Sequence, residues 1–230
     1  MKKIGLIGGT SWHSTVAYYR LINQSVNDYY HGNTNPPLWI VNLNQHEIHQ
    51  LQQSDQWKTI ADIILEAALK LQAAGMDALA LCANTPHKVV DSIQSQLRIP
   101  FLSIATAIGE TIQENGWHKV GLLGTQFTMQ ENFIKGKLQE QIHTEVIVPD
   151  QHEQHEIQRM IAEEFSLGVF STEAKQYFLR MIQDMRNQNA QAVILGCTEI
   201  PLLLQDTKGS LPYIDSMESH CKMIVNAILS

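Results

Sequence analysis

The chain repeats a glycine-containing pattern, and this repeat constrains its fold more than any other feature. The segment Ile4–Thr10, IGLIGGT, returns as Val120–Thr125, VGLLGT, at an offset of 116 residues (120 − 4). A cysteine with a proline four residues later also occurs twice, at Cys82 and Cys197, at an offset of 115 residues (197 − 82). Two independent landmarks at nearly one offset indicate an internal duplication. We therefore expect two similar lobes.

Short aliphatic runs alternate with segments of helical period along the whole chain. This alternation predicts parallel sheets with helices on both faces. The clearest helix covers residues 57–74, where apolar residues follow the i, i+3, i+4 rule and Gly75 provides a left-handed stop. The predicted strands are 3–7, 38–41, 78–81, 101–104, 120–123, 146–148, 192–195 and 213–214. The other predicted helices are 16–26, 86–97, 105–115, 131–141, 156–165, 174–185 and 217–229.

The predicted fold class is α/β, with two pseudo-symmetric lobes that are each a mostly parallel sheet flanked by helices. We expect residues 1–104 and 209–230 to form the first lobe and residues 105–208 the second. Ligands of open α/β sheets bind outside the carboxyl ends of the strands. The sequence therefore predicts an active site in the cleft between the two lobes.

Composition excludes several classes of protein. With 230 residues, 44% of them hydrophobic, the chain can bury a sizeable core. The formal charge is −7 and the 16 Lys and Arg form no basic run, which argues against a nucleic-acid partner. The apolar run after Lys3 ends at Gly8, too soon for a signal peptide or a membrane span. We expect a cytoplasmic protein with no membrane partner.

Two of the three cysteines stand where catalytic groups are expected. An odd number of cysteines without an export signal argues against a disulfide framework. Cys82 and Cys197 each end a predicted strand and precede a helix that tolerates proline in its first turn. Because a helix N-terminus favours a thiolate, we expect the pKa of both thiols to be lowered. The alternative is an inert buried thiol, which is what we expect of Cys221 in its amphipathic helix.

Short polar residues gather after the predicted strands and are candidate substrate contacts. Glu47 follows the second strand, where its carboxylate either binds a substrate ammonium group or stays on the surface, and Glu164 follows the corresponding strand of the second lobe. The hydroxyl and amide candidates are Thr10, Ser11, Asn84, Thr85, Thr125, Thr128 and Thr198.

No motif predicts a cofactor or a metal. The spacing of Gly5, Gly8 and Gly9 does not match G-x-G-x-x-G, and no P-loop is present. His46 with His49, and His152 with His155, have an H-x-x-H spacing without a third ligand at a fixed distance. We therefore expect neither a dinucleotide nor a bound metal.

Three motifs resemble the aspartate/glutamate racemase family, and the resemblance covers the whole chain. They are the segments Ile4–Ser11, Asn84–His87 and Gly196–Pro201. Within this family the chain is most similar to the broad-specificity amino-acid racemases, through Ser11–Trp12, Tyr18–Asn23, His46–Ile48 and Leu123–Met129. The resemblance implies a two-lobed α/β enzyme without pyridoxal phosphate or another cofactor. It also implies a homodimer, an amino-acid substrate and a pair of bases on opposite faces of the α-carbon.

One residue departs from the family pattern. In that pattern the first catalytic cysteine directly precedes Asn-Thr, whereas Ala83 precedes Asn84 here. The repeat offset pairs Cys82 with Cys197, but aligning Asn84-Thr85 with Thr198-Glu199 pairs Ala83 with Cys197. A shift of one residue turns a strand side chain to the other face. We favour the second alignment, since it rests on side chains expected to contact substrate.

The expected function is isomerisation, with Cys197 as acid/base in a cofactor-independent amino-acid racemase. For the first face of the substrate three outcomes stay open: Cys82 reaches inward beside Ala83, a water or Thr85 replaces it, or activity is lost. Segments 47–52 and 163–168, which include Gln52 and Glu164, contain no Arg or Lys to bind a distal carboxylate. A broader substrate range than aspartate and glutamate is therefore favoured. The alternatives are a one-thiol decarboxylase of this fold and a non-catalytic amino-acid-binding protein.

Overall fold

The duplicated pattern folds into two parallel sheets with corresponding strand orders. The computed structural model describes residues 1–230, which divide into unit 1, residues 1–103 and 220–230, and unit 2, residues 104–219. The strand order is β2-β1-β3 in unit 1 and β5-β4-β6-β7 in unit 2. Every ladder is parallel. The predicted α/β fold class is confirmed, and the triplets β2-β1-β3 and β5-β4-β6 are the two copies of the repeat.

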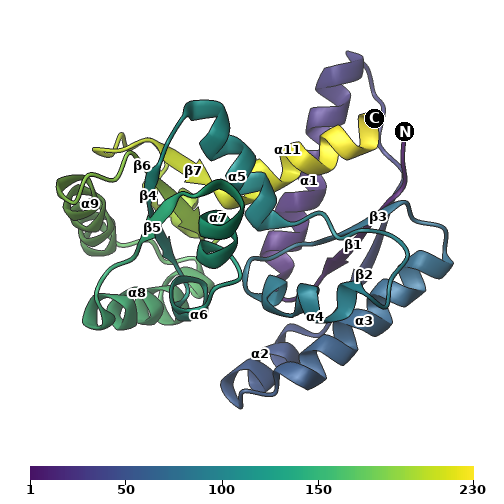
Figure 1. Cartoon of the computed structure of the whole chain (residues 1–230), viewed down its shortest axis with the longest axis horizontal. Helices are drawn as coiled ribbons and strands as arrows, with labels where there is room; N and C mark the ends of the chain where they lie inside the picture. The colour runs from purple at the N-terminus through teal and green to yellow at the C-terminus, as the bar shows by residue number, and fades with distance from the viewer. The chain divides into compact units, whose positions relative to one another are not determined.

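Unit 1 carries its helices on both faces of a three-stranded sheet (Figure 1). Its strands are β1 (Ile4–Gly8), β2 (Leu38–Asn42) and β3 (Ala78–Leu81). Its helices are α1 (Trp12–Tyr30), α2 (Gln45–Gln53), α3 (Trp57–Ala73), the 3₁₀ helix η1 (Thr85–Val89), α4 (Val90–Gln94) and most of α11 (Ser216–Leu229). On one face Ile7, Leu79 and Leu81 join a core with α3, η1 and α4. The strands β1 and β3 are buried throughout, which explains their continuous apolar sequences.

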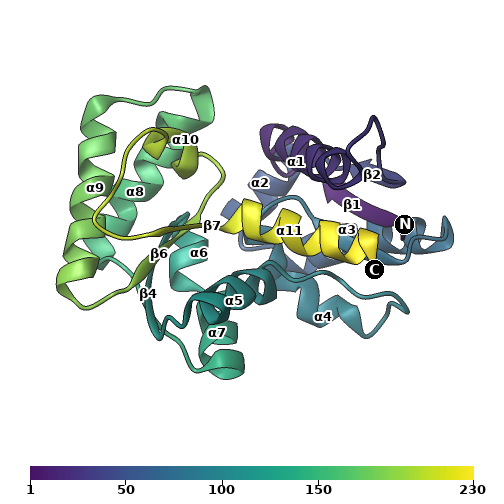
Figure 2. The ribbon, with the colours of Figure 1, turned by 90° about the horizontal axis from the view of Figure 1, so that it is seen from above.

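Unit 2 has the same layering around a four-stranded sheet (Figure 2). Its strands are β4 (Lys119–Gly124), β5 (Glu145–Ile147), β6 (Ala192–Gly196) and β7 (Tyr213–Asp215). Its helices are α5 (Ile104–Asn115), α6 (Gln126–Gln130), α7 (Lys135–Ile142), α8 (Gln151–Glu163), the 3₁₀ helix η2 (Phe165–Leu167), α9 (Thr172–Asn187) and α10 (Ile200–Leu204). Alternate residues of β6 face opposite cores: Val193 and Leu195 pack with α8 and α9, whereas Ile194 packs with α5 and α7.

The structure differs from the sequence predictions at several places. Predicted strand 101–104 is only an isolated bridge between Phe101 and Leu79, because the chain turns into α5 at Ile104. Predicted helix 131–141 begins only at Lys135, since Glu131 is extended. Helix α2 was not predicted, because a single buried residue, Ile48, gives it no apolar period. Residues 209–219 lie in unit 2 and not with the first lobe, because β7 pairs with β6.

The turn after β1 depends on a glycine in a left-handed conformation. Gly9 has φ +82°, and a Cβ there would collide with the backbone N and O of Leu43. Leu43 itself is anchored where its N–H donates to the Gly8 carbonyl, at 2.9 Å. Gly75 has a similar φ of +79°, but a Cβ there would meet nothing within 4 Å. Alanine at either position has the cost of a left-handed backbone, but only alanine at Gly9 also has the cost of a steric collision.

We expect Gly9→Ala to destabilise unit 1 by at least about 2 kcal/mol more than Gly75→Ala, because backbone atoms cannot move aside as a side chain can. Urea unfolding followed by tryptophan fluorescence measures the difference, since Trp12, Trp39 and Trp57 lie in unit 1. Equal losses of stability in the two variants would show that the backbone of Leu43 moves aside without a cost in free energy.

Candidate active site

Side chains tie together the turns that follow β1 and β3 in unit 1. Ser11 caps α1 by accepting from the Ser14 N–H at 3.3 Å, and Thr15 Oγ1 accepts from the Gly9 N–H at 3.0 Å. The Ser14 hydroxyl donates to the Cys82 carbonyl at 2.6 Å. Since carboxyl ends of parallel strands share one sheet edge, these bonds fix the backbone of that edge. Thr10 is buried within it.

The turn after β3 is held from inside by a histidine. His87 Nδ1 lies 2.9 Å from the Ala83 carbonyl and 3.3 Å from that of Asn84. Because a carbonyl only accepts, Nδ1 carries the proton. Asn84 is buried, whereas Ala83 and Thr85 are half-buried. His87 therefore fixes the backbone beside the position where the family pattern has its first cysteine.

A second buried histidine packs next to His87. His220 of α11 is fully buried, with Nε2 2.8 Å from the Leu102 carbonyl and Nδ1 2.9 Å from the Tyr18 hydroxyl. Nε2 must donate to the carbonyl, so Nδ1 accepts from Tyr18. The ring centroids of His220 and His87 lie 5.4 Å apart. Burial chiefly, and then His87, lowers the pKa of His220 to about 3, against the raising effect of Leu102. His220 is thus neutral.

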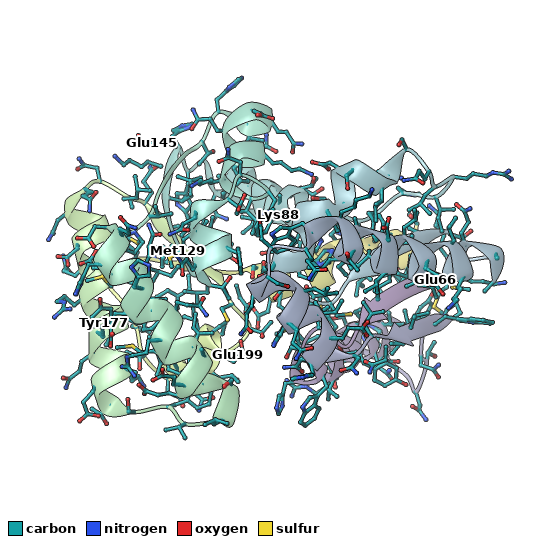
Figure 3. The ribbon with its side chains drawn as sticks, turned by 90° about the horizontal axis from the view of Figure 1, so that it is seen from below. Glu66, Lys88, Met129, Glu145, Tyr177 and Glu199 are labelled. Carbon is teal, nitrogen blue, oxygen red and sulfur yellow. The ribbon has the colours of Figure 1, made fainter.

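The turn after β6 brings a thiol and a carboxylate into contact. Cys197 Sγ donates to Glu199 Oε2 at 3.0 Å, and the Thr198 hydroxyl donates to the same oxygen at 2.9 Å. Cys197 is only 7% exposed, whereas Glu199, labelled in Figure 3, is half-buried. Glu199 is not among the site residues predicted from the sequence, although its position two residues after the cysteine was a usable signal.

The predicted lowering of the thiol pKa values is wrong for both candidate cysteines. Burial raises the pKa of Cys82 to about 12. For Cys197, burial and then the charge and hydrogen bond of Glu199 raise the pKa well above its usual value, against weaker lowering by the backbone N–H groups of Glu199 and Thr198. The following helices, η1 and α10, have five residues each, and their N-termini do not offset desolvation.

The sheet registers decide which residue of unit 1 corresponds to Cys197. Ile4 pairs with Ala78 on β3, and its repeat counterpart Val120 pairs with Ala192 on β6. Counting five residues on from each partner reaches Ala83 in unit 1 and Cys197 in unit 2. Cys82 then corresponds to Gly196, and it is 1% exposed with burial as the only cause of its pKa shift. The pairing of Ala83 with Cys197 is the one that the Asn-Thr alignment requires.

The other predicted contacts have different surroundings. In unit 2, Thr125 caps α6, its Oγ1 3.0 Å from that of the buried Thr128. Glu164 accepts a hydrogen bond from the Ser171 hydroxyl at 3.1 Å and pairs with Arg159 at 3.3 Å. The cation beside Glu164 therefore comes from outside segment 163–168, about one turn earlier in α8. In unit 1, Glu47 is exposed in the first turn of α2 and Gln52 is half-buried near its end.

The structure contains neither a cluster of metal ligands nor a membrane-spanning helix. No group of three or more His, Cys, Asp or Glu side chains is arranged to hold a metal ion. None of the helices combines the length and the apolar character needed to cross a membrane.

The duplicated sheets and the strand-end thiol define a class of α/β proteins with a cysteine–carboxylate pair at the carboxyl end of a parallel strand. A family model described as Asp/Glu/Hydantoin racemase matches residues 7–224, and the chain belongs to this family. The family resemblance predicted from the sequence is thereby confirmed.

The relatives extend over most or all of the chain. The broad specificity amino-acid racemase RacX of Bacillus subtilis is 30% identical over 176 residues, which are 73% of this chain and 71% of RacX. A solved structure from Yersinia pestis, assigned to the Asp/Glu racemases, has 39% identity and a TM-score of 0.95, with full coverage of both chains. An aspartate racemase homologue from Pyrococcus horikoshii has 35% identity and a TM-score of 0.87, again with full coverage.

Proposed function

We propose that the protein is a cofactor-independent amino-acid racemase in which the Cys197 thiol carries a proton to and from one face of the substrate α-carbon. Membership of the racemase family supports the reaction class. The observation that carries the mechanism is the contact of Cys197 Sγ with Glu199, which gives the thiol a partner that exchanges protons. Its raised pKa keeps the thiol protonated at neutral pH and ready to act as an acid.

The opposite face of the α-carbon lacks an equivalent thiol in this proposal. Ala83 corresponds to Cys197 in the strand register and has no proton to give. We infer that a water molecule or the Thr85 hydroxyl serves that face and that Cys82 is structural. The two faces then differ in chemistry, so the two directions of racemisation differ in rate constants.

The substrate in this proposal is a free amino acid, either aspartate or glutamate or a member of a broader range. The broad specificity described for RacX supports the broader range. We propose that polar groups of the strand-end turns bind the α-carboxylate and α-ammonium groups, with Glu47 favouring the ammonium. The proposed contacts are Thr10, Ser11, Glu47, Gln52, Ala83, Asn84, Thr85, Thr125, Thr128, Glu164 and Thr198.

Proton NMR in heavy water tests the proposal with a panel of L- and D-amino acids and no added cofactor. We expect loss of the α-proton signal together with inversion, detected by chiral chromatography. Activity that persists after hydroxylamine treatment excludes a contribution from pyridoxal phosphate. No exchange with any amino acid of the panel would contradict the racemase assignment.

Ala83 also supports a second candidate function, a non-catalytic amino-acid-binding protein derived from a racemase. Such a protein would bind an amino acid in calorimetry yet exchange no α-proton. A one-thiol decarboxylase would instead release carbon dioxide from a malonate-type substrate. We also propose that the protein is cytoplasmic and forms a homodimer. Light scattering of the purified protein measures its mass and so tests the oligomeric state.

A further inference from the structure

A single carboxylate oxygen accepts two hydrogen bonds beside the proposed reacting atom. Glu199 Oε2 accepts from Cys197 Sγ at 3.0 Å and from Thr198 Oγ1 at 2.9 Å. The pair arises locally, in the turn that joins β6 to α10. The thiol proton therefore points at a carboxylate in the resting protein, and an alternative site for that proton lies within hydrogen-bond distance.

We propose that Glu199 is a catalytic residue that takes the Cys197 proton when the thiol acts as a base and returns it when the thiol acts as an acid. This inference rests on the proposed racemase function. In the first step the S–H bond breaks, an O–H bond forms at Oε2, and the electron pair stays on sulfur.

The thiolate then removes the α-proton of the substrate. An S–H bond forms, and the C–H electron pair stays on the α-carbon, delocalised into the substrate carboxylate. A proton from water, delivered to the other face, completes the inversion. Glu199 returns its proton to water before the next turnover, which its half-buried position permits. The reverse reaction runs through the same transfers in the opposite order.

Charge explains why a buried thiol needs this partner. A thiolate formed beside an ionised carboxylate places two negative charges within a few ångströms of each other, one of them on a sulfur that is buried. Transfer of the proton to Glu199 leaves at most one negative charge in the pair at each stage. Cys82 provides the contrast within the chain, because burial alone shifts its titration and no carboxylate accompanies it.

The experiment compares wild-type protein with Glu199→Gln and Glu199→Asp, with Glu173→Gln as the matched control on an exposed glutamate of the same unit. The first readout is the pH titration of ultraviolet thiolate absorbance, corrected with Cys197→Ser so that it reports Cys197 alone. The second is the rate of α-proton exchange in heavy water. Circular dichroism and the melting temperature establish that each variant folds.

In Glu199→Gln we expect the Cys197 titration to move down by about 1 pH unit, since a like charge is removed. The exchange rate should fall by roughly a hundredfold or more, the usual effect of losing a proton-transfer group. Glu199→Asp should recover part of both, and Glu173→Gln should change neither.

Two results would overturn the inference. One is wild-type exchange in folded Glu199→Gln, and the other is a lost exchange rate with an unchanged Cys197 titration, which indicates a structural effect only. If wild-type protein exchanges no α-proton, the proposed function fails. The titration then still reports separately whether Glu199 controls the thiol.

Discussion

Replacing Cys197 with alanine is expected to abolish measurable α-proton exchange, a loss of ~10⁴-fold, while the fold is retained. The proposed reaction passes its proton through Sγ, and alanine has no group that can carry it. The removed atom leaves a small cavity, because Cys197 packs within the core under α9 and α10. Proton NMR in heavy water measures the rate, and circular dichroism checks the fold.

Cys221→Ala is the matched control for this loss, since that thiol is buried in α11 and has no proposed catalytic role. It should retain wild-type exchange. Cys82→Ala should also retain most activity, because Ala83, not Cys82, corresponds to Cys197. Full activity in Cys197→Ala would remove the basis of the mechanism, and inactivity of Cys82→Ala in a folded protein would restore a two-thiol mechanism.

Protonation of His220 is expected to lower the free energy of unfolding of unit 1 by about 3 kcal/mol between pH 7 and about pH 4. In the folded protein burial chiefly, and then His87, lowers the pKa of this histidine to about 3, although the hydrogen bond to Leu102 raises it. In the unfolded chain it is near 6.5. Between these values the unfolded chain binds the extra proton, so stability is fully present above about pH 6.5 and is lost progressively as pH falls toward 3.

Another buried group works in the opposite direction over part of this range. Burial chiefly raises the pKa of Asp215 to about 6, so the folded protein binds a proton there before the unfolded chain does. Stability from Asp215 is therefore gained as pH falls from about 6 towards 3.8. Because Asp215 lies in unit 2, a signal from unit 1 is needed to isolate His220.

Urea unfolding with and without His220→Gln, followed by tryptophan fluorescence across this pH range, measures the effect. Both proteins carry Trp117→Phe, so that the remaining tryptophans all lie in unit 1. Glutamine keeps a donor for the Leu102 carbonyl but does not titrate, so the variant should be less stable near pH 7 and show a shallower pH slope. His13→Gln replaces an exposed histidine of the same unit and should leave the slope unchanged. Parallel slopes in wild-type protein and His220→Gln would show that His220 is not the acid-sensitive group.

The sequence predicted the elements whose signal is local. Strands β1, β3, β4 and β6 are continuous apolar runs because helices cover both faces, and α3 has an apolar stripe that ends at Gly75. The duplication was visible as a repeat, and the strand orders agree with it. Helix α2 escaped prediction because its residues are mostly polar. Residues 209–219 were assigned to the wrong lobe, because the pairing of β7 with β6 is a tertiary contact that local sequence does not reveal.

The candidate site was predicted less completely, for a physical reason. Residue types locate a thiol at a strand end, but its titration depends on burial and on the Glu199 carboxylate, which only the fold reveals. For Ala83 the sequence offered two alignments, the repeat offset that points to Cys82 and the favoured Asn-Thr alignment that pairs Ala83 with Cys197. The ladder registers agree with the favoured alignment.

The inserted arrangement of the units bears on how the chain matures. Unit 2 is one continuous segment, 104–219, whereas unit 1 needs residues 220–230, which provide His220 to bond with Tyr18 of α1. Residues 1–103 are therefore synthesised well before residues 220–230, the segment that they need to complete their fold. The part of the protein that is synthesised first is thus completed last, and a released chain that ends at Ser219 would hold all of unit 2 and an incomplete unit 1.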